Sequence, residues 1–304
     1  MNDEAAWRAE PKVELHLHLE GAAPPGLTRR VAAARGADLS DVLDDAGGYR
    51  WADFASFLDA YDRVARLFAP PEGARALCEA VLRECAAEGV IYAELIVSPD
   101  FAGGAPGPWS EHLAALEEGA AAAEAATGIV ARFVATGVRH FGAAAVEAAA
   151  RLAVGAPSPR LVGFGLAGDE RVGEAADFGR AFAIAREAGL GLTAHAGEFA
   201  GPESVRGALD ALGVARIGHG VRAMEDPELV ARIAAEGVTL ECCPGSNVAL
   251  GVYPFWAAHP IGRLAALGWE PPALRGLART ALDAAFCESG TRGTLAARLG
   301  DRAA

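Results

Sequence analysis

Short apolar runs alternate with longer amphipathic stretches along most of the chain. The apolar runs are rich in Val, Ile, Leu and Phe and have the length of buried strands. They lie at residues 12–18, 90–97, 131–139, 161–167, 191–195, 216–219 and 238–242. The segments between them carry apolar residues at helical spacing. Helices are expected at 53–68, 72–88, 111–126, 228–236, 259–267 and 273–286.

Residues that cap helices support two of these boundaries. Ser110 is placed to cap the helix at 111–126, and Asp226 followed by Pro227 opens the helix at 228–236. Strands that alternate with helices in this way predict parallel strands joined by crossover helices. The chain has 304 residues and no low-complexity linker, so one α/β domain over residues 1–304, such as a TIM-type barrel, is expected.

The first apolar run carries two histidines. His16 and His18 are two residues apart, so on a strand they point to the same face, while leucines alternate with them on the other face. Two imidazoles on one face provide half of a metal site. An isolated pair of this kind also arises by composition, with one histidine in the core and the other in solvent, so the other strands have to decide between these interpretations.

Further polar residues gather where the other apolar runs end. The segments are Gly165-Leu-Ala-Gly-Asp-Glu170, His195-Ala-Gly-Glu198, Ile217-Gly-His-Gly220 and Cys243-Pro-Gly-Ser-Asn247. In a barrel, the loops after the strands converge at one end and build the active site there. The remaining histidines, His112, His140 and His259, are expected in surface or loop positions and are given no role.

Together these motifs, in this order, resemble the adenosine deaminase family of the amidohydrolase superfamily. The resemblance covers residues 11–268 and resumes at 269–298. It implies a (β/α)8 barrel that holds one Zn²⁺ ion, with His16, His18 and His195 as ligands. It also implies that Glu198 protonates N1 of the purine as a general acid and that His219 orients the zinc-activated hydroxide.

Two substrate contacts follow from the same resemblance. The backbone at Gly168 is expected to meet the purine edge, and Glu20 is expected to face the ribose or its replacement. The stretch 51–68 resembles the lid of the family, and its aromatic residues Phe54, Phe57 and Tyr61 are candidates to line the purine pocket. A stripe at this spacing more often packs in the core, and that alternative stays open.

Physical chemistry supports these roles independently. Zn²⁺ with three protein ligands and an open position lowers the pKa of water to near neutrality. A carboxyl group in an enclosed apolar site has a raised pKa and can donate a proton to the ring. The alternative for Glu198 is an ordinary carboxylate at a helix N-terminus.

The chain departs from the family near its C-terminus. Only seven strand patterns are present, and none follows residue 261, so the barrel is predicted to be incomplete. The family's eighth strand, with its Asp-Asp-Pro motif and the aspartate ligand to zinc, is expected to be missing between Gly268 and Trp269. The nearest carboxylates in the sequence that are candidates to replace this ligand are Glu241 and Glu270, with no geometry to support either. Weaker zinc binding and impaired activity are therefore expected.

Composition narrows the possible partners and location. The chain has 27 Lys and Arg against 40 Asp and Glu, a net charge of −13, which argues against binding nucleic acid or an anionic membrane. No secretory signal or apolar run of membrane-spanning length is seen, and the five cysteines show no metal or disulfide pattern. A cytoplasmic protein is expected, while the oligomeric state is not predicted.

The preferred functional prediction is hydrolytic deamination of adenosine or deoxyadenosine, a purine nucleoside, to inosine and ammonia. One alternative is adenine deaminase, because Glu20 after His-Leu is also found in relatives that act on the free base. A second is a non-catalytic relative that binds purines. A third is a different metal hydrolase, since phosphoesterase barrels also open with a His-x-His strand.

Overall fold

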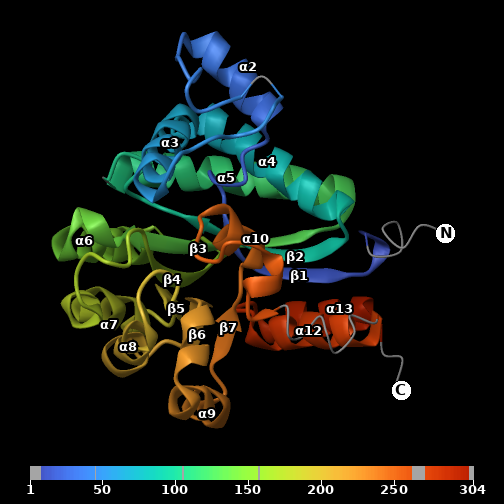
Figure 1. The fold of residues 1–304 in the computed structure, drawn as a ribbon. Coiled ribbons are helices and arrows are strands. Elements are labelled where there is room, and N and C mark those ends of the chain that lie inside the picture. The colour runs from blue at the N-terminus through green and yellow to red at the C-terminus, as the bar shows by residue number, and fades with distance from the viewer. Residues whose placement is uncertain (1–7, 45, 105, 157, 262–270, 301–304) are drawn as a thin grey trace.

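Seven parallel strands form one sheet that curves into a nearly closed barrel (Figure 1). The computed structural model describes residues 8–44, 46–104, 106–156, 158–261 and 271–300. Each strand pairs with the next along the chain. The strands are β1 (Lys12–His18), β2 (Val90–Val97), β3 (Val130–Val138), β4 (Leu161–Ala167), β5 (Gly191–Ala196), β6 (Arg216–His219) and β7 (Thr239–Glu241). All seven agree with the predicted strands to within one residue at each end.

The barrel is incomplete, as the sequence predicts. No hydrogen-bonded pairing joins β7 back to β1 within the described residues, so both remain edge strands of the sheet there. The predicted junction at Gly268 and Trp269 lies outside the described residues, as do Glu270 and most of the expected helix at 259–267.

Helices surround the outer face of the sheet (Figure 1). They are α2 (Pro25–Arg35), α3 (Phe54–Phe68), α4 (Pro71–Ala87), α5 (Pro106–Thr127), α6 (Ala143–Gly155), α7 (Gly179–Glu187), α8 (Pro202–Gly207), α9 (Pro227–Glu236), α10 (Pro244–Ala249), α12 (Pro271–Ala284) and α13 (Ser289–Leu299). Short helical turns are η1 (Arg139–Phe141), η2 (Ala175–Phe178), η3 (Ala208–Leu212), η4 (Val221–Glu225) and η5 (Trp256–Ala258).

The structure confirms one of the two predicted helix caps and contradicts the other. The side chain of Asp226 accepts hydrogen bonds from the N–H groups of Glu228 and Leu229, which confirms it as the cap of α9. The prediction that Ser110 caps the next helix is wrong, because α5 begins at Pro106 and Ser110 lies inside it. Proline is well suited to the first turn of a helix, where its missing N–H has no partner to lose.

The hydrophobic core has two parts. The larger part lies between the sheet and the helices from α2 to α9, and it includes Leu19 of the segment after β1. The smaller part lies where α12 and α13 pack against β1 and β2, and it includes Leu15 and Tyr92. Leu15 and Leu19 are 7% and 1% exposed, so they are buried as predicted, whereas Leu17 between them is only partly buried.

One aromatic ring and a buried ion pair lie inside the barrel, near the amino-terminal ends of the strands. The ring of Phe286, which follows α12, lies so close to Gly163 and Gly191 that a Cβ atom at Gly191 would come within 2.3 Å of it. The guanidinium of Arg216 stacks over this ring, 3.5 Å from its centroid, and forms a 2.6 Å ion pair with Glu94. The expected helix at 273–286 therefore ends at Ala284, and Phe286 turns inward instead.

None of the helices in the described part of the chain combines the length and apolar character that a bilayer crossing requires.

Candidate active site

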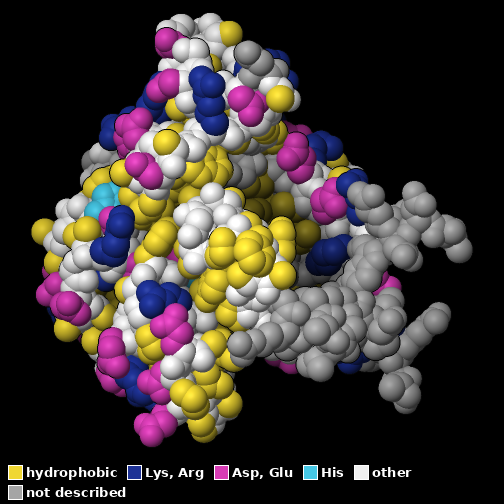
Figure 2. Space-filling model, viewed as in Figure 1, with side chains coloured by type: hydrophobic (Ala, Val, Ile, Leu, Met, Phe, Trp, Pro, Cys, Tyr) yellow, Lys and Arg dark blue, Asp and Glu magenta, His cyan; other side chains and the backbone are white. Residues whose placement is uncertain are grey.

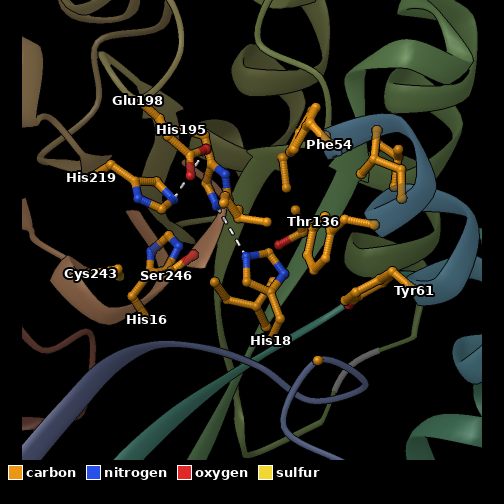
Figure 3. A pocket seen from close by; sticks show the side chains of 18 of the residues that line it. His16, His18, Phe54, Tyr61, Thr136, His195, Glu198, His219, Cys243 and Ser246 are labelled. Carbon is orange, nitrogen blue, oxygen red and sulfur yellow. Dashed lines mark hydrogen bonds and ion pairs between the residues drawn. The ribbon is translucent and has the colours of Figure 1, made fainter. Parts of the chain in front are cut away.

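Four histidine side chains from three strands converge at the carboxyl ends of these strands (Figure 3). His16 and His18 come from β1, His195 from β5 and His219 from β6. Each ring centroid in the contacting pairs lies 4.6–5.3 Å from its neighbour. The parallel strands meet at this edge, which explains why residues far apart in sequence come together as predicted.

The nitrogen atoms of this cluster have the spacing of metal ligands. Nε2 of His18 lies 3.2 Å from Nε2 of His195. Two ligands that bind Zn²⁺ tetrahedrally at about 2.0–2.1 Å are about 3.3 Å apart. His16, His195 and His219 each offer a nitrogen within 4.8 Å of the others. His16 and His195 of the predicted ligand set thus share this spacing with His219, whereas His18, the third predicted ligand, lies beside His195 but outside this group of three.

The orientation of His16 also suits a metal. Its Nδ1 lies 2.7 Å from a carboxylate oxygen of Glu241, which only accepts hydrogen bonds, so Nδ1 carries the proton. Its Nε2 is buried and has no hydrogen-bond partner among the described residues. A buried acceptor without a partner is costly unless something binds it. The lone pair of Nε2 thus faces the cluster, ready to bind a cation.

Burial keeps the imidazoles of His18, His195 and His219 neutral, as metal ligands must be. Loss of solvent, with the neighbouring imidazole of His16 as a smaller cause, lowers the pKa of His18 to about 3. The same causes lower the pKa values of His195 and His219 well below the ordinary range.

Gly218 provides the space that the rings need. A Cβ atom at this position would lie 2.7 Å from the ring of His16 and 2.8 Å from the ring of His195. Such distances are shorter than any normal packing contact, so a side chain here would push two imidazoles apart. The glycine of the Ile217-Gly-His-Gly220 segment is therefore needed for the cluster itself.

His219 has an unusual backbone conformation. Its φ of 62° is the only positive value of a non-glycine residue in the described part of the chain. Such strain is uncommon and is concentrated at functional sites. The conformation turns the ring into the barrel, where Nε2 lies 3.5 Å from a carboxylate oxygen of Glu198.

Glu198 is a buried carboxyl group beside the imidazoles. It is 5% exposed, and burial, with the nearby Glu170 carboxylate as a second cause, raises its pKa to about 8. It is therefore largely protonated at neutral pH and able to donate a proton. This environment differs from that of the solvated helix-terminal carboxylate considered as the alternative.

The loop that carries Glu198 is held by Glu170. The Glu170 carboxylate accepts hydrogen bonds from the N–H groups of Glu198, Phe199 and Ala200, at 3.0, 2.7 and 2.9 Å, and also from the N–H of Gly197. The structure shows that Glu170 fixes the loop, while Asp169 pairs with Arg171.

A cavity of about 340 Å³ opens above the histidine cluster. Its walls are mainly apolar, and hydrophobic side chains gather around the hollow between α3 and α10 in Figure 2. Phe54, Phe57 and Tyr61 of α3 line it, so these residues form a pocket wall and do not serve only as core. The ring of Phe54 packs against Phe199, 4.2 Å between centroids, which joins α3 to the Glu198 loop.

The two predicted substrate-binding residues differ in position. Gly168 lines the cavity and has a φ of 96°, and a Cβ atom there would collide with the ring of His140. Glu20 is 5% exposed and is not one of the lining residues. Its carboxylate accepts a 2.8 Å hydrogen bond from the hydroxyl of Tyr61, so it is already paired within the wall.

The three histidines given no role have different positions. His140, in the η1 turn, and His259, after η5, lie in loops as expected, although His259 is only 2% exposed and His140 lines the cavity and accepts the N–H of Asp169. The expectation was wrong for His112, which is 5% exposed and lies inside α5, because a single histidine outside a motif carries no signal of its burial. Asn247 was noted only as the end of a segment, and it proves to contact His219.

The structure does not support Glu241 as the carboxylate ligand for which it was a candidate. One of its oxygens binds His16 and accepts the hydroxyl of Thr193 at 3.0 Å, and the other lies 2.5 Å from Nε of Arg216. Both oxygens are therefore occupied by protein groups. Among the described residues, Glu198 is the one carboxylate that lines the cavity.

The comparison with protein families agrees with this geometry. Residues 11–270 match the family model described as adenosine deaminase. The chain belongs to the adenosine deaminase family. This membership confirms the resemblance drawn from the motifs, and it agrees with the barrel fold.

Two similar proteins carry the name adenine deaminase. The chain is 48% identical to an adenine deaminase of Chelativorans sp. (strain BNC1), over 95% of this chain and 97% of the relative. A crystal structure of adenine deaminase from Arthrobacter aurescens superposes with a TM-score of 0.84 at 27% identity, covering 96% of this chain and 98% of the other. The expected adenosine reaction is not supported by these names, which favour the alternative of adenine.

A third relative bears on the metal. An amidohydrolase from Burkholderia ambifaria, crystallised with bound Zn, superposes with a TM-score of 0.85 at 25% identity, covering 97% of this chain and 91% of the other. The histidine cluster thus lies in a chain whose structural neighbours include an amidohydrolase that binds zinc.

The alignment with the Chelativorans relative also shows a difference in length. It spans 320 positions, whereas 95% of this chain is about 289 residues. About 30 positions of that alignment therefore have no residue in this chain.

Proposed function

We propose that this protein catalyses the hydrolytic deamination of adenine to hypoxanthine and ammonia. The observation that carries the proposal is the floor of the cavity, where imidazoles lie at the spacing of metal ligands and a largely protonated carboxyl group lies beside them. Together these groups supply a metal site and a proton donor within reach of one small planar ligand.

The residues fit a Zn²⁺ ion. His16, His18 and His195 would hold it, because the free Nε2 of His16 and the 3.2 Å spacing of the other two nitrogens suit its ligand preferences. When bound, the ion supplies Lewis-acid chemistry that makes water a stronger nucleophile near neutral pH.

Glu198 would supply the proton that the purine ring needs. Attack of water at C6 puts negative charge on the ring, and a proton donated to N1 by the neutral carboxyl group prevents that charge from building up. Glu198 would then be a carboxylate, and it would take a proton from the added oxygen and pass it to the amino group on C6. The C6–N bond breaks and ammonia leaves. The remaining hydroxyl proton would return to Glu198 as the oxygen becomes the C6 carbonyl of hypoxanthine.

His219 would orient the attacking water. Its ring faces Glu198 across 3.5 Å and belongs to the same cluster as the proposed ligands. Gly168 would approach the edge of the purine, since its lack of a side chain leaves the backbone exposed in the cavity wall.

The cavity wall favours a free base over a nucleoside. Glu20, the group expected to face a ribose, is paired with Tyr61 and does not line the cavity. Aromatic side chains of α3 form much of the wall, and they suit a flat purine better than a hydroxyl-rich sugar. The names of the relatives point the same way.

The first test is a time course with adenine and, separately, adenosine, using zinc-loaded protein. We expect hypoxanthine from adenine, abolished by a chelator and restored by zinc, and adenosine turned over at least about 100-fold less efficiently, as pocket contacts can discriminate. Glu198→Gln should reduce kcat by about 100-fold or more, because general acid catalysis contributes that much.

Two results would contradict the proposal. Inosine formation at a higher kcat/KM than hypoxanthine formation would restore adenosine as the substrate. Adenine binding without turnover by folded, zinc-loaded protein would instead identify a purine-binding relative that lacks catalysis.

A further inference from the structure

A chain of polar groups runs behind His219, away from the substrate cavity. Asn247 of α10 is fully buried, and its Nδ2 lies 3.1 Å from Nδ1 of His219. On its other side, Oδ1 of Asn247 lies 3.1 Å from Nε2 of His259, which is 2% exposed. The chain ends at the backbone of Ile261, whose N–H donates to Nδ1 of His259 at 3.1 Å.

The backbone N–H of Ile261 sets the direction of every hydrogen bond in this series of polar groups. A backbone N–H is always a donor, so Nδ1 of His259 accepts and carries no proton. A neutral imidazole then has its proton on Nε2, and burial favours this neutral form by lowering the pKa of His259. His259 therefore donates from Nε2, and the amide oxygen of Asn247 accepts.

The orientation of the Asn247 amide follows. With its oxygen turned toward His259, its NH2 group faces His219 and donates to Nδ1. The flipped amide would need both nitrogens of His259 to accept, which requires a negatively charged ring. Nδ1 of a neutral His219 is thus an acceptor, and the proton of this ring lies on Nε2.

We propose that His259 and Asn247 are positioning residues that hold His219 with its proton on Nε2, directed at Glu198 and the cavity. This inference rests on the proposed function, in which His219 orients the attacking water. Held in this way, the neutral ring is a hydrogen-bond donor toward the reacting oxygen and cannot accept a proton through Nε2.

The surroundings of Asn247 support a fixed position. Its N–H donates to the carbonyl of Cys243 at 3.0 Å, and its carbonyl accepts from Tyr253 at 3.2 Å. The ring of Tyr253 packs edge-on against His259, 4.7 Å between centroids. The amide NH2 also lies 3.5 Å from an oxygen of Glu198, so one side chain faces both proposed catalytic groups.

The test uses the zinc-loaded protein labelled with 15N at histidine. NMR of the imidazole nitrogens reports which nitrogen of His219 carries the proton, and a His219 variant assigns the signal. We expect an unprotonated Nδ1 in the wild type. Asn247→Asp replaces the donor by an acceptor, so we expect a protonated Nδ1 and a fall in kcat of about 100-fold, the size seen when one donor to a reacting oxygen is lost, with little change in KM.

Two further variants separate positioning from folding. His259→Gln keeps an N–H donor toward Asn247 and should retain kcat within about threefold of wild type, whereas His259→Leu removes the donor and should lose at least tenfold. His112→Gln is the matched control, because His112 is also buried and bonded through Nδ1, to the carbonyl of Ala69 and far from this chain. It should leave kcat and the His219 signal unchanged.

A protonated Nδ1 of His219 in the wild type overturns the proposal, whatever the activity. So does an unchanged kcat in Asn247→Asp when its NMR signal has shifted. The NMR result does not depend on turnover, so a protein that fails to deaminate adenine still tests the hydrogen-bond chain, and the two proposals fail separately.

Discussion

At the scale of single residues, burial gives Glu198 its chemistry. The same carboxyl group in solvent would be ionised at neutral pH, whereas here burial and the charge of Glu170 raise its pKa to about 8. A group of this kind makes the folded protein sensitive to pH, because the unfolded chain ionises it at its ordinary pKa.

Glu198→Gln should change how stability depends on pH. Between about pH 4.5 and 8 the folded protein keeps the proton that the unfolded chain releases, so the free energy of unfolding falls as pH rises. In protein freed of metal by a chelator, Glu198→Gln should remove this pH-dependent fall in the free energy of unfolding. The variant should therefore be more stable than wild type at pH 8.5 but not at pH 4. Urea unfolding at both pH values measures this.

An exposed glutamate provides the control for this prediction. The side chain of Glu203 on α8 is 87% exposed, so Glu203→Gln should change stability equally little at both pH values. A Glu198→Gln variant that shows no gain at high pH would mean that the carboxyl group is ionised without cost in the folded protein.

At the scale of elements, a side-chain contact links the two edge strands. No backbone pairing joins β7 to β1 among the described residues, yet Glu241 at the end of β7 holds the ring of His16 on β1. Arg216 of β6 and Thr193 of β5 hold Glu241 in turn. A carboxylate behind a metal-binding histidine fixes its tautomer and makes it a better ligand.

Glu241→Gln should therefore weaken zinc binding by about 10-fold to 100-fold. Competition with a zinc-binding dye measures the dissociation constant without any need for activity. Glu94→Gln is the matched control, because Glu94 is also buried and paired with Arg216 but does not touch a histidine in the described structure. Equal zinc affinities for the two variants would show that Glu241 does not position His16.

At the scale of the whole molecule, a side chain from outside the sheet fills the barrel near the amino-terminal ends of its strands. Phe286 enters from the turn after α12 and fills the space that Gly163 and Gly191 leave, while Arg216 covers its ring. The C-terminal helices thus take part in the interior of the barrel as well as in its outer layer.

Phe286→Ala should cost about 3 kcal/mol of stability, because the ring fills a space that the rigid strands cannot close. Urea unfolding measures the change in the free energy of unfolding. Leu277→Ala on α12 is the control, since Leu277 is 50% exposed and its loss should cost about 0.5 kcal/mol or less. Similar costs for both would mean that the barrel collapses around the missing ring.

Much of this molecule follows from local sequence signals. The seven strands were predictable because apolar runs of strand length stand out between alanine-rich helices, and the order of strands and helices requires parallel pairing. The convergence of His16, His18, His195 and His219 follows as well, because parallel strands of a barrel end at one edge.

The substrate was harder to predict from the sequence. The motifs favour adenosine, with Glu20 toward the ribose or its replacement, but a motif does not reveal the direction of a side chain. The contact between Glu20 and Tyr61 joins the end of β1 to α3. It depends on how the lid packs over the barrel, and no local pattern encodes that packing.

The sequence by itself determined the repeating elements, the family and the residue types at the barrel edge, because each depends on local periodicity or on motifs. Only the tertiary structure decided that Glu241 supports His16, that His259 and Asn247 lie behind His219, and that Phe286 fills the barrel. These contacts join residues distant along the chain. Their directions come from the packing of whole elements and from the need to pair buried polar groups.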